Sequence, residues 1–175
     1  MCDVCDSSPD RPWWSGVDAS ELATPRGIVT VRAATAVELV PLRREVLRDG
    51  RDDPPATLAA DDASDTLHLC ATHAGTVVAA ATFVADPLAG ERRAIRLALM
   101  AVAPGWQRQG LGRAVLDVAL ARADATGTTV WAYARVSALG FYERRGFVAT
   151  GPAFDHAMGL PHRIIVRRAL LRPKG

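Results

Sequence analysis

The residues best suited to bind a ligand lie in the stretch 107–113, which reads Gln-Arg-Gln-Gly-Leu-Gly-Arg. An apolar, strand-like run over 97–102 precedes it, and a helical pattern begins at residue 114. A turn that joins a strand to a helix points unpaired backbone N–H groups, and the positive end of the helix dipole, at one place. Gly110 and Gly112 have no side chain that would keep an anion away from the backbone. The stretch therefore predicts a phosphate-binding turn.

Three phosphate-binding motifs can be compared with this turn. A P-loop needs a Lys followed by Ser or Thr after its last glycine, and no such pair follows Gly112. A dinucleotide-binding turn needs a third glycine at the position of Val115. Residues 107–112 match the third pattern, (Arg/Gln)-x-x-Gly-x-(Gly/Ala). In this respect the chain resembles the GCN5-related N-acetyltransferase (GNAT) family, in which the turn holds the pyrophosphate of acetyl-CoA.

A second stretch, 141–147, resembles the other signature of this family, a short helix written Phe-Tyr-Glu-x-x-Gly-Phe. It follows a strand-like run. Ser137 is suited to cap this helix, and Gly146 is suited to end it. The resemblance covers residues 28 to about 171, and the specific motifs are confined to 97–147. The two signatures occur in the order that the family shows.

The resemblance implies an α/β (α+β) fold with a mixed, mostly antiparallel central sheet of about six to seven strands and about four flanking helices. It also implies a sheet that is splayed between the strands ending near Val102 and Ala134. The length suits a single N-acetyltransferase domain over 26–175, preceded by a flexible arm over 1–25. A Gly- and Pro-containing stretch over 151–162 predicts a loop before the last strand.

The same resemblance implies that acetyl-CoA is the cosubstrate and that no metal takes part. Two positions depart from the family pattern. Arg135 lies near the place where many relatives have an Asn that holds the pantetheine arm, and Ser137 is a candidate to replace it. Arg108 replaces a common Gly. The residues expected to bind the coenzyme are Met100, Ala101, Val102, Gln107, Arg108, Gln109, Gly110, Leu111, Gly112, Arg113 and Ser137.

Acyl transfer from a thioester to an amine needs a neutral amine and a group that protonates the leaving thiolate. By resemblance, Tyr142 is the expected general acid. Many relatives carry a Glu base on the strand before the turn, but residues 96–100 contain no carboxylate. His162 is the named candidate for the base, because 159–162 resembles a Gly-x-Pro-His element near the acceptor pocket of some relatives; proton loss to water is an alternative. The wider set of candidates is His68, Tyr133, Asp155, His156 and His162.

Charge is distributed unevenly along the 175 residues, although the net charge is only +2. Residues 1–91 carry seven Arg and fifteen acids, a net −8, whereas 92–175 carry thirteen Arg, one Lys and four acids, a net +10. The basic half contains both signatures and suits a phosphate-rich coenzyme. Its arginines are not clustered with stacking aromatics, which argues against a nucleic-acid partner. The acidic stretch 49–65 predicts a solvated loop or, because the resemblance implies that this region borders the acceptor site, a surface that attracts cations.

The N-terminal stretch contributes two further expectations. Its acidic start is not a signal peptide, and no apolar run in the chain is long enough to cross a membrane, which predicts a cytoplasmic protein. Cys2 and Cys5 form a Cys-x-x-Cys that lacks the second half of a zinc site. The pair Trp13 and Trp14 is expected to dock on the domain or a partner, or to cover a local apolar spot.

The sequence therefore predicts an acetyl-CoA-dependent N-acetyltransferase that acts by direct transfer on a primary amine, either a small molecule or a peptide. Neither a nucleic acid nor a membrane is expected as a partner, and a homodimer is left open. The alternative is a catalytically silent acyl-CoA-binding sensor or scaffold, which the absence of a carboxylate over 96–100 favours.

Overall fold

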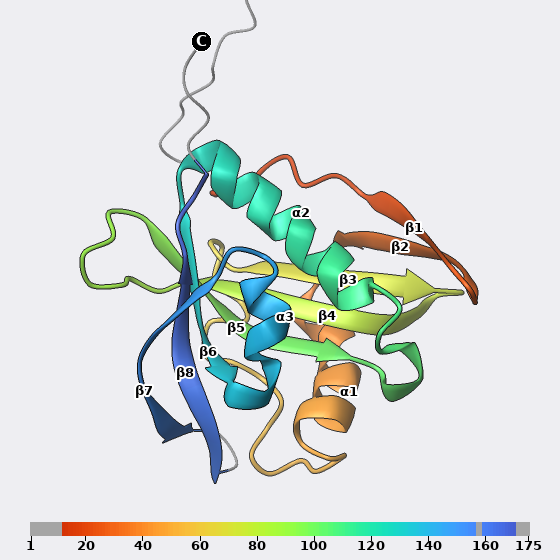
Figure 1. Cartoon of the computed structure of the whole chain (residues 1–175). Coiled ribbons are helices and arrows are strands. Elements are labelled where there is room, and N and C mark those ends of the chain that lie inside the picture. Colours follow the sequence, from red (N-terminus) through yellow and green to blue (C-terminus); the bar gives the residue numbers. More distant parts are fainter. Residues whose placement is uncertain (1–11, 157–158, 171–175) are drawn as a thin grey trace, which may run out of the picture.

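The computed structural model describes residues 12–156 and 159–170. They form one sheet of eight strands in the order β1-β2-β3-β4-β5-β6-β8-β7, flanked by helices (Figure 1). All neighbouring strands are antiparallel except β5 and β6, which are parallel. This confirms the predicted class, with eight strands and three α-helices in the described residues. The elements are β1 (Ser20–Thr24), β2 (Gly27–Ala33), α1 (Ala36–Leu47), β3 (Leu67–His73), β4 (Thr76–Ala85), β5 (Ala94–Val102), the 3-10 turn η1 (Pro104–Trp106), α2 (Leu111–Thr126), β6 (Thr129–Arg135), the 3-10 turn η2 (Val136–Ala138), α3 (Leu139–Glu143), β7 (Val148–His156) and β8 (Leu160–Arg167).

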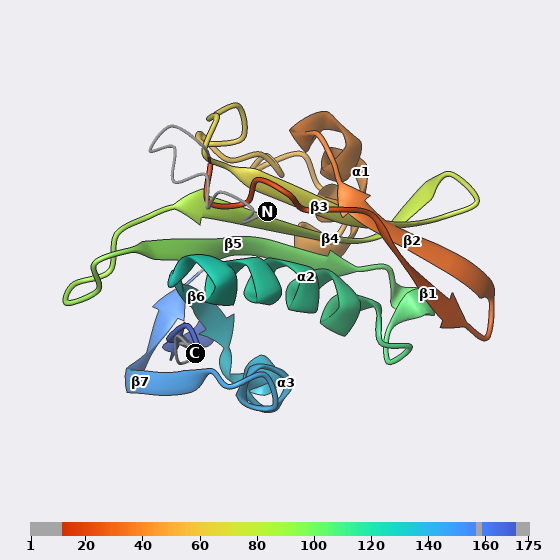
Figure 2. The same ribbon diagram turned by 90° about the horizontal axis from the view of Figure 1, so that it is seen from above.

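The helices α1 and α2 cover opposite faces of the sheet (Figure 2). Val115 of α2 is fully buried in the larger core, whereas Leu39 of α1 is fully buried in the smaller one. Side chains alternate along β4, so Ala79 and Ala81 face α2 and Ala80 faces α1. Because both faces are covered, β4 is buried along most of its length. No helix among the described residues is both long and apolar enough to span a membrane.

The sheet opens between β5 and β6. Their parallel pairing ends at Arg96 and Trp131. Just beyond this point Ala98 is an extra residue in the pairing of β5 with β4, and such a bulge bends and twists a strand. β6 stays paired with β8 as far as Arg135. The splay predicted between these strands is therefore confirmed, and no described strand pairs with the edge of β5 over 97–102 that faces away from β4.

Part of the stretch expected as a flexible arm belongs to the fold. β1 is an edge strand that pairs with β2, and its five residues show little of the alternation that would reveal a strand in the sequence. The Trp13 ring meets the Phe83 ring edge-on, with 6.1 Å between centroids. The Arg122 Nε group donates a hydrogen bond of 3.0 Å to the Trp13 carbonyl. The first tryptophan thus docks on the domain, whereas Cys2 and Cys5 lie outside the described residues.

The strands β7 and β8 occupy most of the stretch 151–162, so the expectation of a loop there was wrong. Gly151 and Pro152 suggested the loop, since both residues weaken central strands. However, β7 lies at the edge of the sheet, and an irregularity in its pairing with β8 accommodates them. The extra length of β7 places Phe154 and His156 on a strand instead of in a loop.

Candidate active site

The turn before α2 has the geometry of an anion site. Gly110 caps the 16-residue helix with a left-handed φ of 86°. Ala114 is the first helical residue whose N–H reaches a turn carbonyl, that of Gly110 at 2.9 Å. The backbone N–H groups of residues 111–113 therefore have no intrahelical acceptor, and no other acceptor contacts them in the described part of the chain. They lie at the positive end of the helix dipole, where an anion is stabilised.

Gly112 brings this helix end close to the free edge of β5. A Cβ atom on Gly112 would lie 3.1 Å from Met100 Cε and 3.3 Å from Val102 Cγ2, which is too close for the present packing. The side-chain amide of Gln107 donates to the Val102 carbonyl at 3.3 Å, and that of Gln109 donates to the Gly105 carbonyl at 3.1 Å. Both glutamine side chains thus stiffen the turn. The groups that remain free to donate hydrogen bonds to a ligand are the backbone N–H groups of residues 111–113.

An aromatic contact anchors the outer end of the turn. The Trp106 ring in η1 lies 4.8 Å from the His73 ring, and the Arg26 guanidinium carbon lies 5.1 Å from the Trp106 centroid. Arg26 follows β1, and His73 ends β3, so two hairpins of the sheet hold the turn in place. The backbone N–H groups are therefore held on a fixed support, which limits the entropy that a ligand would have to remove.

The charges beside the turn differ in how far they are neutralised. Arg113 is paired with Asp117 at 3.2 Å, and Arg145 also contacts Asp117 at 3.2 Å. Arg108 forms no ion pair within the described residues. Its φ of 60° is left-handed, a conformation that glycine adopts more readily than arginine does. Arg108 thus supplies an uncompensated positive charge at the turn.

Tyr142 approaches the same region from α3. Its hydroxyl donates a weak hydrogen bond to the Met100 sulfur at 3.7 Å, and its side chain is 9% exposed. The rings of Phe141 and Phe147 pack edge-on against it. Burial raises the pKa of Tyr142 to about 12, so the phenol keeps its proton at neutral pH. The structure therefore brings Met100, Gly112 and a buried proton donor together at the free edge of β5.

The structure also places three other residues that were predicted to bind the coenzyme, namely Ala101, Leu111 and Ser137. The side chains of Ala101 and Leu111 are buried in the two cores, so only their backbone groups can reach a ligand. Ser137 lies exposed in η2, beyond the end of β6. The residue that caps α3 is Ala138, without a side-chain hydrogen bond, so the expectation that Ser137 caps this helix was wrong. The role of Ser137 toward a coenzyme stays a prediction.

His68 lies in a buried polar network and is not available as a base. Its Nδ1 atom lies 3.0 Å from the Thr82 hydroxyl, and its Nε2 atom lies 2.9 Å from the Asp61 carbonyl. Arg43, which is 1% exposed, forms a 2.9 Å ion pair with the Asp61 carboxylate. With both ring nitrogens engaged, His68 serves to hold the acidic stretch 49–65 against the sheet.

Three other candidates for the base lie together on β6, β7 and β8. The His156 ring lies 4.9 Å from the Tyr133 ring and 5.1 Å from the His162 ring. His162 is 5% exposed, and its Nδ1 atom lies 2.7 Å from the Leu160 carbonyl. Asp155 precedes His156 on β7, so its side chain points to the other face of the sheet. The sequence named these histidines, but the pairing of β7 with β8 that brings them together was not predicted.

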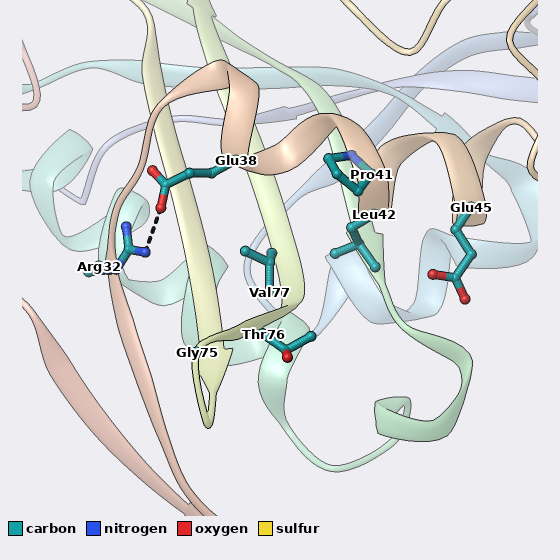
Figure 3. A pocket seen from close by; sticks show the side chains of 8 residues that line it. All are labelled: Arg32, Glu38, Pro41, Leu42, Glu45, Gly75, Thr76 and Val77. Carbon is teal, nitrogen blue, oxygen red and sulfur yellow. Dashed lines mark hydrogen bonds and ion pairs between the residues drawn. The ribbon is translucent and has the colours of Figure 1, made fainter.

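A cavity of about 380 Å³ lies elsewhere, between α1 and the hairpin of β3 and β4 (Figure 3). Its charged wall is the Arg32–Glu38 ion pair, with a distance of 2.6 Å. The hydrogen bond from Arg32, followed by that from the Thr35 N–H, lowers the pKa of Glu38 to about 2. Glu38 also completes the capping box of α1, so these charges satisfy one another within the fold. None of the predicted site residues lines this cavity, and no group of three or more His, Cys, Asp or Glu among the described residues could hold a metal ion.

Comparison with known proteins agrees with this geometry. Residues 55–162 match a family described as "Acetyltransferase (GNAT) domain". The fold is similar to that of an acyl-CoA N-acyltransferase from Pseudomonas aeruginosa, with a TM-score of 0.67 and 24% identity, covering 79% of this chain and 99% of the other. It is also similar to Ard1 from Thermoplasma volcanium, with a TM-score of 0.65 and 19% identity over 81% of this chain and 98% of the other.

Two further likenesses are more distant or shorter. An aminoglycoside 6'-N-acetyltransferase in complex with coenzyme A has a TM-score of 0.64 and 13% identity, covering 82% of this chain and 99% of the other. A stretch of 34 residues, 19% of this chain, is 59% identical to mycothiol acetyltransferase from Thermobifida fusca (strain YX). This chain spans 10% of the length of that curated relative. The structural likenesses establish the fold, and the short match does not extend to a substrate.

Proposed function

The chain belongs to the GNAT acetyltransferase family, and from this premise we propose that it transfers an acetyl group from acetyl-CoA directly to a primary amine. The observation that carries the proposal is the convergence at Met100 of the α2 N-terminus, the free edge of β5 and the buried Tyr142 phenol. They would serve as the anchor, the pairing edge and the proton donor that acyl transfer from a thioester requires.

Each of these parts has a definite role in the proposed reaction. The backbone N–H groups of 111–113 would bind the pyrophosphate, with Arg108 adding charge. The free edge over 97–102 would form strand-like hydrogen bonds with the amides of the pantetheine arm. The amine nitrogen bonds to the acetyl carbon and the C–S bond breaks. The thiolate takes the Tyr142 proton, and the proton lost from the new amide nitrogen balances the one that Tyr142 regains from water.

Binding of acetyl-CoA should raise the melting temperature of the protein. A ligand that binds the folded state alone stabilises it by about 2.7 kcal/mol when its concentration is 100 times Kd. Calorimetric or fluorescence melting across a range of acetyl-CoA concentrations measures this shift. A melting temperature that does not change up to millimolar acetyl-CoA would contradict both the proposed enzyme and the acyl-CoA-binding alternative.

The alternative is a catalytically silent acyl-CoA-binding module, and one observation favours it. Leu97 and Met100 stand on the free edge of β5, and no carboxylate is present over 96–100 to act as the base. Both candidates predict coenzyme binding, so binding alone does not separate them. Release of free thiol from acetyl-CoA in the presence of a panel of amines separates them, because only the enzyme gives amine-dependent release.

The acceptor is proposed to be cationic before it is deprotonated, either a small molecule or a peptide. The acidic stretch 49–65 supports this in part only, because Asp61 is held by Arg43 in a buried ion pair and Asp52 is held by Arg44 at 3.0 Å. Asp53, Asp62 and Asp65 are exposed and form no ion pair within the described residues. These three residues can attract an ammonium group, and Asp62 and Asp65 are the two that lie next to β3 in the sequence.

Replacing Asp62 and Asp65 together by Asn should lower kcat/KM for the amine by a few-fold at low salt, and the difference should shrink as salt rises. Exposed charges act over roughly 8–10 Å at physiological ionic strength. The aspartates would therefore raise the rate at which the amine associates with the protein, and not the rate of the chemical step. The matched control changes Asp18 to Asn and Glu21 to Gln, which removes the same charge from exposed positions on the N-terminal side. Equal salt dependence in the parent and in both variants would show that the acidic stretch does not steer the acceptor.

We further propose that the protein is cytoplasmic, uses no metal and has neither a nucleic acid nor a membrane as a partner.

A further inference from the structure

Five ring side chains pack against one another on the face of the sheet opposite α2, with Trp131 and His162 buried and Tyr133 and His156 exposed. We refer to them as the ring cluster: Trp131, Tyr133, Phe154, His156 and His162. The alternate residues Val130, Ala132 and Ala134 pack in the core beneath α2, so the odd-numbered side chains of β6 point the other way. The register pairs Phe154 with His162 and continues the same face across β8 and β7. Successive ring centroids along the cluster are 4.9 to 5.5 Å apart.

The ring cluster borders the opening between β5 and β6. It begins at Trp131, the last residue of β6 that pairs with β5, and follows β6 toward the end of that strand. α2 covers the other face of the sheet (Figure 2), and the turn over 107–113, the proposed coenzyme turn, leads into it. An amine that attacks a thioester held at the free edge of β5 must approach from the side that the coenzyme does not fill. The ring cluster lies on that side, and Tyr133 and His156 are its exposed members.

The charged groups around the cluster leave it without a free carboxylate. Arg96 on β5 lies over the Trp131 and Tyr133 rings, at 5.6 and 5.8 Å from their centroids, and its guanidinium is paired with Asp86 at 2.6 Å. Arg135 ends β6 on the same face, opposite His162 in the register. Among the described residues, the titratable groups facing His156 are thus Tyr133 and His162, with Arg96 as the nearby cation.

The two histidines differ in what they can do. His162 is buried, and its Nδ1–H donates to the Leu160 carbonyl, which fixes the ring. His156 is exposed, and no hydrogen bond engages its ring nitrogens within the described residues. Partial desolvation of its ring lowers the pKa of His156, and the charges of His162 and Arg96 act in the same direction. At neutral pH the His156 imidazole is therefore uncharged and open to solvent, as a proton acceptor must be.

We propose that the ring cluster is the acceptor-binding surface and that His156 takes the proton from the acceptor ammonium, an inference that rests on the proposed transferase function. An N–H bond of the ammonium breaks, and its proton moves to the unprotonated nitrogen of His156. The freed lone pair then attacks the acetyl carbon, and the imidazolium returns the proton to water. His162 positions His156 and does not itself contact the amine.

The same surface points to a class of acceptor. Tyr133 is 37% exposed, and the cluster presents ring faces and edges instead of acidic side chains. Such a surface binds an amine through the apolar or aromatic group that carries it, since aromatic contacts favour offset or edge-on packing of rings. The acceptor is therefore a primary amine borne on an aromatic or apolar group, in contrast to a highly polar amine such as a polyamine.

The test compares His156→Asn with the parent across pH. For a 2-phenylethylamine acceptor, the variant should lose about 10²- to 10⁴-fold in kcat/KM at pH 7, the range that general bases contribute. The acid limb of the parent profile should fall below the ordinary histidine pKa. The variant should instead gain rate steadily toward the pKa of the amine itself, roughly 10 for an alkylamine. The affinity for acetyl-CoA and the melting temperature should not change.

Asp155→Asn is the matched control, because Asp155 neighbours His156 on β7 but points to the other face, and it should keep the parent profile. A second variant, Tyr133→Ala, should reduce the preference for 2-phenylethylamine over butylamine. His156→Asn with the parent rate and pH profile would overturn the assignment of the base. An unchanged preference in Tyr133→Ala would overturn the acceptor surface. A parent protein that acetylates no amine would overturn the transferase function itself, which is a distinct outcome.

Discussion

Tyr142→Phe should lower kcat by about 10²- to 10⁴-fold and leave the Kd for acetyl-CoA nearly unchanged. In the proposed reaction this phenol, which donates a hydrogen bond to the Met100 sulfur, is the general acid. Phenylalanine fills the same space between Phe141 and Phe147 without the hydroxyl. Because the proton is needed only as the thiolate leaves, its loss affects the chemical step and not coenzyme binding. Stopped-flow or quench measurement of a single turnover gives the rate of that step without interference from product release.

The pH dependence provides a second measure of this role. Burial raises the pKa of Tyr142 to about 12, and the group must be protonated to act as an acid. Its contribution is therefore present at neutral pH and is lost only as the pH rises through about 12. No basic limb from Tyr142 should appear below about pH 10, a phenol's ordinary pKa. A single-turnover rate that is the same in Tyr142→Phe and in the parent would remove Tyr142 from the mechanism.

Gly110→Val should weaken acetyl-CoA binding by at least about 100-fold. Restoring the binding geometry of the turn would cost backbone strain of about 1–3 kcal/mol, and a displaced turn would lose its charge-assisted hydrogen bonds to the ligand. Gly110 has a φ of 86°, which a β-branched residue adopts only with strain, so the backbone before α2 must shift. That shift displaces the N–H groups of 111–113, and the new side chain stands at the mouth of the turn. Isothermal titration with acetyl-CoA measures the change.

Gly127→Val provides the matched control at the other end of the same helix. Gly127 has a φ of 66°, and a Cβ atom added to either glycine would have no neighbouring atom within 4 Å. The two substitutions should therefore cost similar amounts of stability, whereas only the one at Gly110 should affect coenzyme binding. If Gly110→Val binds acetyl-CoA as tightly as Gly127→Val does, the turn is not the pyrophosphate site.

The features predicted correctly from the sequence depend on neighbours in the chain. The turn over 107–113 combines a strand end, glycines and a helix start within about a dozen residues, and α2 follows from apolar residues at helical spacing. Coenzyme binding at this turn stays a prediction. The splay between β5 and β6 came from the family resemblance. The bulge at Ala98, which lies just beyond the end of the β5–β6 pairing, has no signal in the run Ala94–Val102, because the extra residue is defined only by the pairing with β4.

The features that the sequence did not predict depend on contacts between distant residues. Asp61 looked like one of several solvated acids, but Arg43, 18 residues earlier, holds it in a buried ion pair. His68 was one of five candidates for the base, but the structure places its Nδ1 atom against the Thr82 hydroxyl. Because of Gly151 and Pro152, the sequence predicted a loop where β7 continues. The effect of these residues on a strand depends on whether it lies at the edge of a sheet, as β7 does. The ring cluster follows from that strand and could not be assembled without it.

The measurement that tests the central claim most directly follows the acetyl group itself. The parent protein is incubated with acetyl-CoA carrying carbon-13 in the acetyl group, together with aromatic, alkyl and peptide amines in turn. Free thiol and labelled amide are then quantified by mass spectrometry and NMR. We predict that labelled N-acetyl amine and thiol form in equal amounts, and only when an amine is present. Acetyl-CoA that binds to the protein but yields no labelled amide with any amine would contradict the account and identify the chain as a silent acyl-CoA-binding module.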